Sequence, residues 1–230
     1  MIVAFINPSP ALVSPDPTPE SEGVASGLSQ LLRGADLIPV TGMDEAELLS
    51  VPAAFTSWQI LQHGAVILTP DGEEDVAWRR LIMETQRFGQ QALELAHQAA
   101  LHITQLGQLG VEVELLERYG RPLLIQIRHP HDLELALDQA GQAMQDWLEG
   151  GPFQTDLRAL RQGLTLSVLP RGLNPASAVN YVMGMLEERP ELIVGVSAQA
   201  SDADFLALCD YALIPGSSSW VSDVATDEND

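Results

Sequence analysis

Three short apolar runs in this chain have the pattern of strands that are covered on both faces. Residues 2–6, 37–40 and 192–196 contain no residue with a polar side chain. A sheet with one wet face would show alternating polar and apolar residues, whereas parallel strands are buried by helices on both sides. The runs therefore predict an α/β fold with a parallel sheet, assembled from both ends of the chain.

The segments between the first two runs predict loop and helix in turn. Prolines at 8, 10, 15, 17 and 19 favour an extended loop over residues 8–22, followed by a helix over 23–33. Thr41 with Asp44 three residues later has the pattern of a capping box, which predicts a short helix ending near Ser50.

The hydrophobic pattern changes in the middle of the chain. Apolar or small residues at helical spacing over residues 81–106 predict a long amphipathic helix. After it we expect a hairpin, a second helix and two further strands, over residues 111–116 with 122–127, 132–148, 156–160 and 164–169. After Pro170 the alternation resumes with helices over 174–188 and 202–208 and a strand over 211–214.

This order predicts a three-layer αβα, Rossmann-like core interrupted by an inserted α+β domain. We assign residues 1–72 and 170–216 to the core and residues 73–168 to the insertion. The polar, acidic residues 217–230 predict a flexible tail.

Charge narrows the possible functions. The net charge is −21, and the eleven basic residues are all arginine. Without lysine, a P-loop lysine or a Schiff base to a carbonyl cofactor is excluded. A chain this acidic is repelled by phosphate at long range, so we expect no nucleic acid and no membrane surface as partner.

Two features of the sequence bear on the cellular compartment of the protein: the single cysteine and the lack of a long apolar run. Cys209 has no intrachain partner for a disulfide and cannot form a thiolate metal cluster. No run reaches the ~20 apolar residues that a membrane span requires. We expect a cytoplasmic protein in which Cys209 is an inert core thiol.

Four segments together resemble the haloacid-dehalogenase (HAD) superfamily, in particular its sucrose-phosphate phosphatase-like, sugar-phosphatase branch with an inserted cap domain. Residues 2–12 are similar to the first strand and its Asp-x-Asp-Gly-Thr-Leu loop, and residues 39–42 to the strand that ends in Thr-Gly. Residues 169–178 are similar to the segment that carries the family's lysine, and residues 197–206 to its metal-binding Gly-Asp-Ser-x-Asn-Asp motif.

The resemblance implies an aspartate nucleophile, a second carboxylate as acid/base, a lysine and acidic Mg²⁺ ligands. At those positions this chain has Asn7, Ser9, Pro175 and Ala198. An amide is not a workable nucleophile for this step, and a serine cannot supply carboxylate acid/base chemistry. The resemblance therefore implies that no catalytic residue is intact and that the family's Mg²⁺ site is lost.

Thr41 and Asp202 alone match the family pattern. Thr41 could bind a phosphate oxygen together with the amide of Gly42, or it could be a helix N-cap. Asp202 could hold a residual cation, or it could be an acid in a first helical turn whose capping box Ser201 and Asp204 complete. The candidate ligand-binding residues are Thr41, Gly42, Asn7 and Asp202, and Asp202 is a weak metal candidate.

Several other features have a structural and a functional interpretation. Pro175 after Asn174 predicts a helix start. Ser197 sits in a sequence similar to a nucleophile elbow that lacks the final glycine. His129 and His131 could bind a metal, although their position in a turn between a strand and a helix also accounts for this pair. The arginine pairs 79–80 and 118 with 121 could bind an anion or a partner, or could pair with surface glutamates.

Together these observations favour a pseudophosphatase that binds a protein partner or a sugar-phosphate-like ligand and uses no cofactor. The alternative is an active sugar-phosphate phosphatase with non-standard or misaligned motifs. A third hypothesis is a structural subunit of an active enzyme. The missing lysine favours the first hypothesis whichever way the motifs are aligned.

Overall fold

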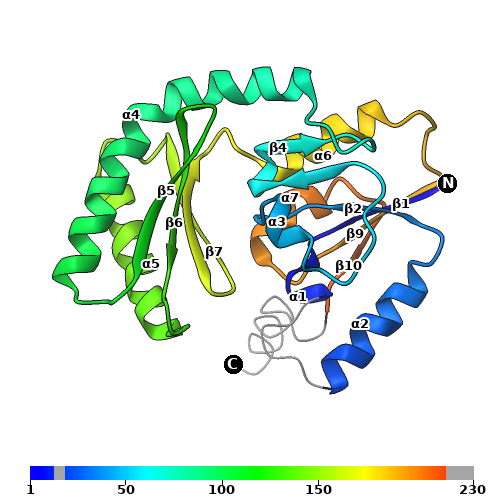
Figure 1. Cartoon of the computed structure of the whole chain (residues 1–230), viewed down its shortest axis with the longest axis horizontal. Helices are drawn as coiled ribbons and strands as arrows, with labels where there is room; N and C mark the ends of the chain where they lie inside the picture. The colour runs from blue at the N-terminus through cyan, green and yellow to red at the C-terminus, as the bar shows by residue number, and fades with distance from the viewer. Residues whose placement is uncertain (13–18, 216–230) are drawn as a thin grey trace, which may run out of the picture. The chain divides into compact units, whose positions relative to one another are not determined.

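The computed structural model describes residues 1–12 and 19–215, and the chain divides into two compact units. Unit 1 comprises Met1–Arg79 with Asn174–Asp230, and unit 2 comprises Arg80–Leu173 (Figure 1). The expected tail, 217–230, lies outside the described residues. Of the helices that the structure describes, none is long and apolar enough to cross a membrane.

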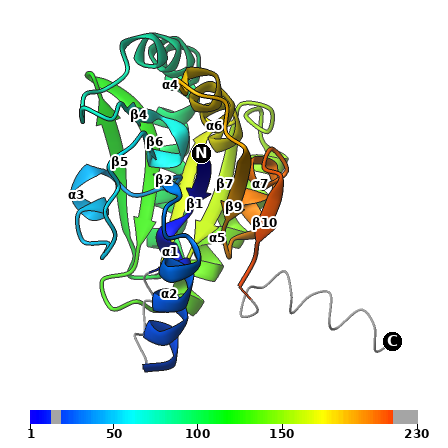
Figure 2. The same cartoon turned by 90° about the vertical axis from the view of Figure 1, so that its right-hand side faces the viewer.

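Unit 1 is built on a parallel sheet, as the apolar runs predict. Its strands are β1 (Ile2–Ile6), β2 (Asp36–Pro39), β9 (Leu192–Val196) and β10 (Tyr211–Leu213), in the order β10-β9-β1-β2. Each neighbouring pair is parallel. Figure 2 shows these strands running together through unit 1. The sheet therefore joins the amino-terminal segment of the chain to a segment that follows it by nearly 200 residues.

The remaining elements of unit 1 surround this sheet. A short antiparallel hairpin, β3 (Gln59–Leu61) with β4 (Val66–Leu68), is joined by the 3₁₀ turn η1 (Gln62–Gly64). The helices are α1 (Pro8–Ala11), α2 (Pro19–Leu31), α3 (Glu45–Leu48), α6 (Pro175–Met185) and α7 (Ala203–Leu206), with the 3₁₀ turn η2 (Ala200–Asp202) before α7. Ala4, Ile6 and Val196 pack against Leu32 in the core.

The prediction of an extended loop over residues 8–22 is wrong at both ends of this segment, where the structure has helices. Pro8 is the first residue of α1, and Pro19 is the first residue of α2. Proline is well tolerated at these positions because its missing N–H would have no helical partner and its φ is already helical. Residues 13–18 of the expected loop lie outside the described residues.

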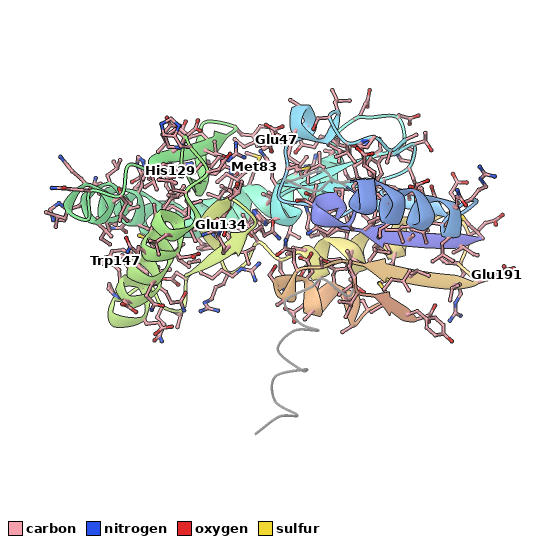
Figure 3. All side chains as sticks on the ribbon, turned by 90° about the horizontal axis from the view of Figure 1, so that it is seen from below. Glu47, Met83, His129, Glu134, Trp147 and Glu191 are labelled. Carbon is pink, nitrogen blue, oxygen red and sulfur yellow. The ribbon has the colours of Figure 1, made fainter. Side chains whose placement is uncertain are left out.

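The short helix α3 is capped one turn later than expected. The N-cap is Asp44, whose carboxylate accepts from the Glu47 N–H at 2.8 Å, while the Glu47 carboxylate accepts from the Asp44 N–H at 3.0 Å. Glu47 is labelled on this helix in Figure 3. The N-cap interpretation of Thr41 is therefore wrong, because a carboxylate and a glutamate at N3 are available to cap the helix.

Unit 2 is an antiparallel sheet with two helices on one face. Its elements are α4 (Val76–Leu106, whose first residues belong to unit 1), β5 (Glu112–Arg118), β6 (Arg121–Arg128), α5 (Glu134–Gly150), β7 (Leu157–Gln162) and β8 (Thr165–Pro170). The strand order is β5-β6-β8-β7. Leu93 on α4 and Leu137 on α5 share one buried cluster with Ile125 and Val168 of the sheet. The expected α+β organisation is present.

The two boundaries lie a few residues from those expected after residues 72 and 168. The first falls inside α4, because its start is bound to the β3–β4 hairpin: Asp75 N–H donates to the Ile67 carbonyl at 2.9 Å, and the Trp78 indole donates to the Gly64 carbonyl at 3.0 Å. At the second, Arg158 on β7 donates to the Leu173 carbonyl at 2.9 Å, which keeps residues 171–173 with unit 2.

Candidate functional site

Three polar residues follow the carboxyl ends of adjacent parallel strands in unit 1. Asn7 follows β1, Ser197 follows β9, and Thr41 lies two residues beyond β2. Backbone bonds extend the sheet to this edge, since Asn7 N–H donates to the Val196 carbonyl at 2.8 Å and Val40 N–H donates to the Ile6 carbonyl at 2.8 Å. Ligands of open α/β sheets bind at this edge, so it is the candidate site.

Asn7 uses both ends of its side-chain amide. Its Oδ1 accepts from the Ser9 N–H at 3.2 Å, which makes Asn7 the N-cap of α1. Its Nδ2 donates to Asp202 Oδ2 at 2.7 Å. The reverse orientation would aim a carbonyl oxygen at a carboxylate and an NH₂ group at an N–H, so the neighbours fix the orientation of the amide.

Asp202 is the acceptor at the centre of the site. It is 3% exposed, and its Oδ2 also accepts from Ser197 Oγ at 2.7 Å. Ser197 Oγ in turn accepts from the Gln199 N–H at 2.9 Å. Two donors thus converge on one oxygen of a buried carboxylate, and these hydrogen bonds offset the cost of burying a polar group.

Asp202 is an acid in the first turn of η2, as one interpretation predicts, but the capping box of Ser201 and Asp204 is absent, since neither η2 nor α7 has a side-chain hydrogen bond at its N-cap. Asp202 ends η2 and precedes α7, yet its side chain makes no cap hydrogen bond to that helix. The carboxylate is turned to Asn7 and Ser197 instead. The hydroxyl of Ser197, which the elbow interpretation would make a nucleophile, donates its hydrogen to this carboxylate.

Thr41 lies at the same edge without a cap role. Its N–H donates to the Ile60 carbonyl at 3.0 Å, and its hydroxyl oxygen accepts from the Met43 N–H at 3.2 Å. The side chain thus closes a local turn over Gly42, and both candidate ligand-binding residues belong to that turn. The structure brings Thr41 to the strand ends with Asn7 and Ser197.

His63 was not singled out by the sequence, and it belongs to this edge. It is buried, and its N–H donates to the Thr41 carbonyl at 2.9 Å. Gln62, His63 and Gly64 all have positive φ, at 49°, 57° and 89°. Such strain in consecutive residues is a feature of functional sites. The sequence signal was its place between two short apolar runs, next to a glycine.

Pro175 opens α6, as the sequence predicts. Asn174 is the N-cap and accepts from the Ala176 N–H at 2.9 Å, and Pro175 stands at N1. The arginines of unit 1 are Arg33, Arg79 and Arg189. Arg33 and Arg189 precede β2 and β9 and so approach the opposite edge of the sheet. Neither arginine follows the carboxyl end of a strand, which is where a cation that contacts the candidate site would be expected.

The donor set does not fit Mg²⁺. This ion takes oxygen ligands, usually one or two carboxylates. Here Asn7 directs its NH₂ group and Ser197 its hydroxyl hydrogen at the single carboxylate, Asp202. In the described part of the chain, no three histidine, cysteine or acidic residues are grouped so that they could hold a metal. The amide and the hydroxyl therefore occupy the Asp202 oxygen as hydrogen-bond donors, at the position where a cation would bind.

The other candidate residues have structural roles. His129 Nδ1 accepts from the His131 N–H at 3.0 Å in the turn between β6 and α5; Figure 3 labels His129 in this turn and Glu134 at the start of α5. Cys209 is partly buried, and burial and then Asp210 raise the pKa of its thiol to about 11. A thiol with so high a pKa is unreactive at neutral pH.

Comparisons with known proteins establish the fold. No family model and no curated protein sequence matches the chain. Among solved structures, a sucrose-phosphatase from Synechocystis, in complex with sucrose and phosphate, has a TM-score of 0.57 at 16% identity, over 100% of this chain and 88% of the other. The IMP-nucleotidase of Plasmodium falciparum has a TM-score of 0.60 at 12% identity, over 94% and 63%.

A third similar structure is the C-terminal domain of a Candida albicans trehalose-6-phosphate phosphatase, with a TM-score of 0.52 at 14% identity, over 89% of this chain and 71% of that one. These neighbours are HAD-superfamily phosphatases. The chain therefore has the HAD fold, with a Rossmann-like core and an inserted α+β cap domain, as the sequence resemblance implies.

Proposed function

We propose that this chain is a HAD-fold pseudophosphatase that acts by binding, and that its ligand is a protein partner. The observation that carries the proposal is the hydrogen bond between Asn7 Nδ2 and Asp202 Oδ2. It ties the residue at the family's nucleophile position to the one carboxylate of the site.

The chemistry of Asn7 supports this proposal. Phosphoryl transfer to an aspartate requires an ionised carboxylate, and the amide nitrogen has no lone pair available for attack. The amide oxygen is neutral and already accepts from the Ser9 N–H. At position 9, a hydroxyl group replaces the carboxylate that would carry the proton to the leaving group.

Charge favours a protein partner over a sugar-phosphate-like ligand. The chain contains no lysine, and eight of its eleven arginines belong to unit 2. Unit 1 therefore holds few cations, and its candidate site presents a buried carboxylate. A phosphate group would meet a negative potential there, with no ammonium to offset its charge.

The proposal is tested with the purified full-length protein and a panel of phosphate monoesters, including sugar phosphates, in millimolar Mg²⁺. Phosphate release should equal that of buffer, and the Asn7→Ala variant should give the same value. Turnover that copurifies with the protein and disappears in Asn7→Ala would overturn the proposal and support the active sugar-phosphate phosphatase. A Ser29→Ala variant on exposed α2 is the matched control.

A further inference from the structure

The strand β5 lies at an edge of the unit 2 sheet and is paired on one side, with β6. Its exposed and partly buried residues alternate over Glu112, Val113, Glu114 and Leu115. Val113 and Leu115 pack toward the helices with the core cluster. Because side chains alternate along a strand, Glu112 and Glu114 project from the opposite face.

A cavity adjoins this edge on the helix side. It measures about 580 Å³ and is lined by the last turns of α4 and by the residues that lead into β5, including Leu101, Thr104, Gln105, Val111 and Val113. An extended chain laid along β5 would place the side chains next to Val111 and Val113 beside this cavity. The cavity has room for an aliphatic side chain beside Leu101 and Val113.

The acidic face of β5 defines the charge of the occupant. Arg128 is the cross-strand neighbour of Glu112, and its Nε also donates to Thr165 on the next strand at 3.3 Å. The cross-strand neighbour of Glu114 is Gln126, which has no charge. Basic residues on an added strand would therefore lie opposite carboxylates, a favourable cross-strand pairing.

A second copy of this chain does not fit the same edge. Two β5 strands paired antiparallel about Val113, the strand position beside the cavity, would bring Glu112 of each copy opposite Glu114 of the other. Like charges directly opposite are destabilising, and two chains of net charge −21 also repel each other at long range. Acidic residues on an edge strand prevent self-association, and they leave a basic strand as the complementary occupant.

We propose that β5 binds an extended segment of a partner protein in which basic residues alternate with aliphatic ones. The segment adds a strand to the unit 2 sheet, with its aliphatic side chains over the cavity and its basic side chains against Glu112 and Glu114. Backbone hydrogen bonds supply affinity and the alternating side chains supply specificity. This inference rests on the binding role proposed above and names the partner's chemistry.

The probe is a blocked ten-residue peptide of alternating lysine and valine, titrated into the full-length protein at low salt. Glu112→Lys/Glu114→Lys should weaken binding about 10-fold, because two attractions become repulsions. Asp146→Lys/Glu149→Lys makes the same change of net charge on exposed α5 and should change affinity less than about 2-fold. Equal losses in the two variants would overturn the proposal.

Two further measurements locate the peptide. Amide hydrogen exchange should slow over Glu112–Arg118 and stay unchanged in β7, the opposite edge strand. Gln105→Trp fills the cavity without a change of charge and should weaken peptide binding. If the Glu112→Lys/Glu114→Lys variant does not fold, this variant tests whether the peptide binds at β5. Protection elsewhere, or equal binding of a peptide with five lysines followed by five valines, would overturn the proposal.

These results are separable from the proposed function. A failure of the peptide to bind β5, with phosphate release still at the level of buffer, would remove this surface and leave the pseudophosphatase proposal standing. Phosphatase activity lost in Asn7→Ala would remove the pseudophosphatase proposal whatever the peptide does.

Discussion

The Asn7 amide donates a hydrogen bond of 2.7 Å to the carboxylate of Asp202, 195 residues further along the chain. The HAD resemblance implies two carboxylates at these positions, with a divalent cation between anionic groups. On this resemblance, Asn7 is a neutral donor at a position where one of the anions is expected. The site therefore holds its shape through a hydrogen bond and needs no cation to balance adjacent negative charges.

Asn7→Asp should destabilise the protein. It replaces a donor with an anion at hydrogen-bond distance from Asp202, and two buried carboxylates repel each other. We expect a loss of about 2–4 kcal/mol in the free energy of unfolding at pH 7.5, measured by urea titration. Acidification toward pH 5, which protonates one of the pair, should recover part of the loss. Full stability at pH 7.5 would contradict this account.

Asn7→Ala is the matched variant. It removes the donor and the cap without adding charge, so its cost should be about 1–3 kcal/mol and should vary less with pH between 5 and 7.5. A pH response as large as that of Asn7→Asp would show that repulsion between positions 7 and 202 is not the cause.

Mg²⁺ should not stabilise the wild-type protein specifically. A ligand raises the melting temperature only if it binds the native state, and the donors around Asp202 do not fit the ion. Melting temperatures in millimolar MgCl₂ and in NaCl of equal ionic strength should coincide. Asn7→Asp should show a shift specific to Mg²⁺, because a cation then relieves the repulsion. A wild-type shift that disappears in Asp202→Asn would show a surviving metal site.

The fold could be predicted from local pattern, and the site could be predicted only in part. The run at residues 192–196 coincides with β9, because a strand buried on both faces must be apolar throughout. The partner of Asp202 could not be predicted the same way. The sequence placed Asp202 in a helical turn capped by Ser201 and Asp204. The bond from Asn7 joins residues 195 positions apart, which no local spacing encodes.

The backbone errors have a similar cause. A proline-rich stretch favours a loop, but proline is also favoured at the first position of a helix. The sequence alone therefore does not decide whether Pro8 and Pro19 belong to a loop or begin a helix. His63 was missed because its burial depends on the approach of η1 to Thr41, a contact between segments that no local spacing encodes.

Tyr181 predicts a loss of stability at alkaline pH. Its hydroxyl donates to Asp75 Oδ1 at 2.8 Å, and burial, followed by this hydrogen bond and the charge of Asp75, raises the pKa of Tyr181 from 10.0 to about 12. The folded state thus favours the protonated phenol. This contribution is complete below pH 10 and is lost as the pH rises through about 12.

Tyr181→Phe should therefore unfold more readily at pH 8 by about 1 kcal/mol and lose less stability between pH 10 and 12 than the wild type. Urea titrations across this range measure both effects. Tyr211→Phe, at an exposed tyrosine, is the control and should follow the wild-type curve. If all three proteins lose stability in parallel, the Tyr181–Asp75 bond does not set the alkaline limit.

Gly64→Ala should lower the free energy of unfolding for two reasons, backbone strain and a steric contact, and a second variant, Gly34→Ala, separates them. Gly64 has φ of 89°, and an added Cβ would lie 3.1 Å from the Asn174 carbonyl oxygen. Gly34 has φ of 90° with nothing within 4 Å of the same position. Gly34→Ala should cost about 1 kcal/mol from backbone strain alone, and Gly64→Ala about 1–3 kcal/mol more. Equal costs in urea titrations would mean that η1 moves away from α6.

The fragment 80–173 should fold alone, because its core closes within it. The buried cluster between Ala92 and Val168 is supplied entirely by α4, α5 and the antiparallel sheet. A fragment 80–170, which keeps β8 whole, should be less stable by about 1–3 kcal/mol, since it lacks the hydrogen bonds of residues 171–173. Among them are Arg171 N–H to the Asp156 carbonyl at 2.8 Å and Arg158 to the Leu173 carbonyl at 2.9 Å. Thermal unfolding followed by circular dichroism compares the two, and a non-cooperative transition in 80–173 would show that unit 2 depends on unit 1 for its stability.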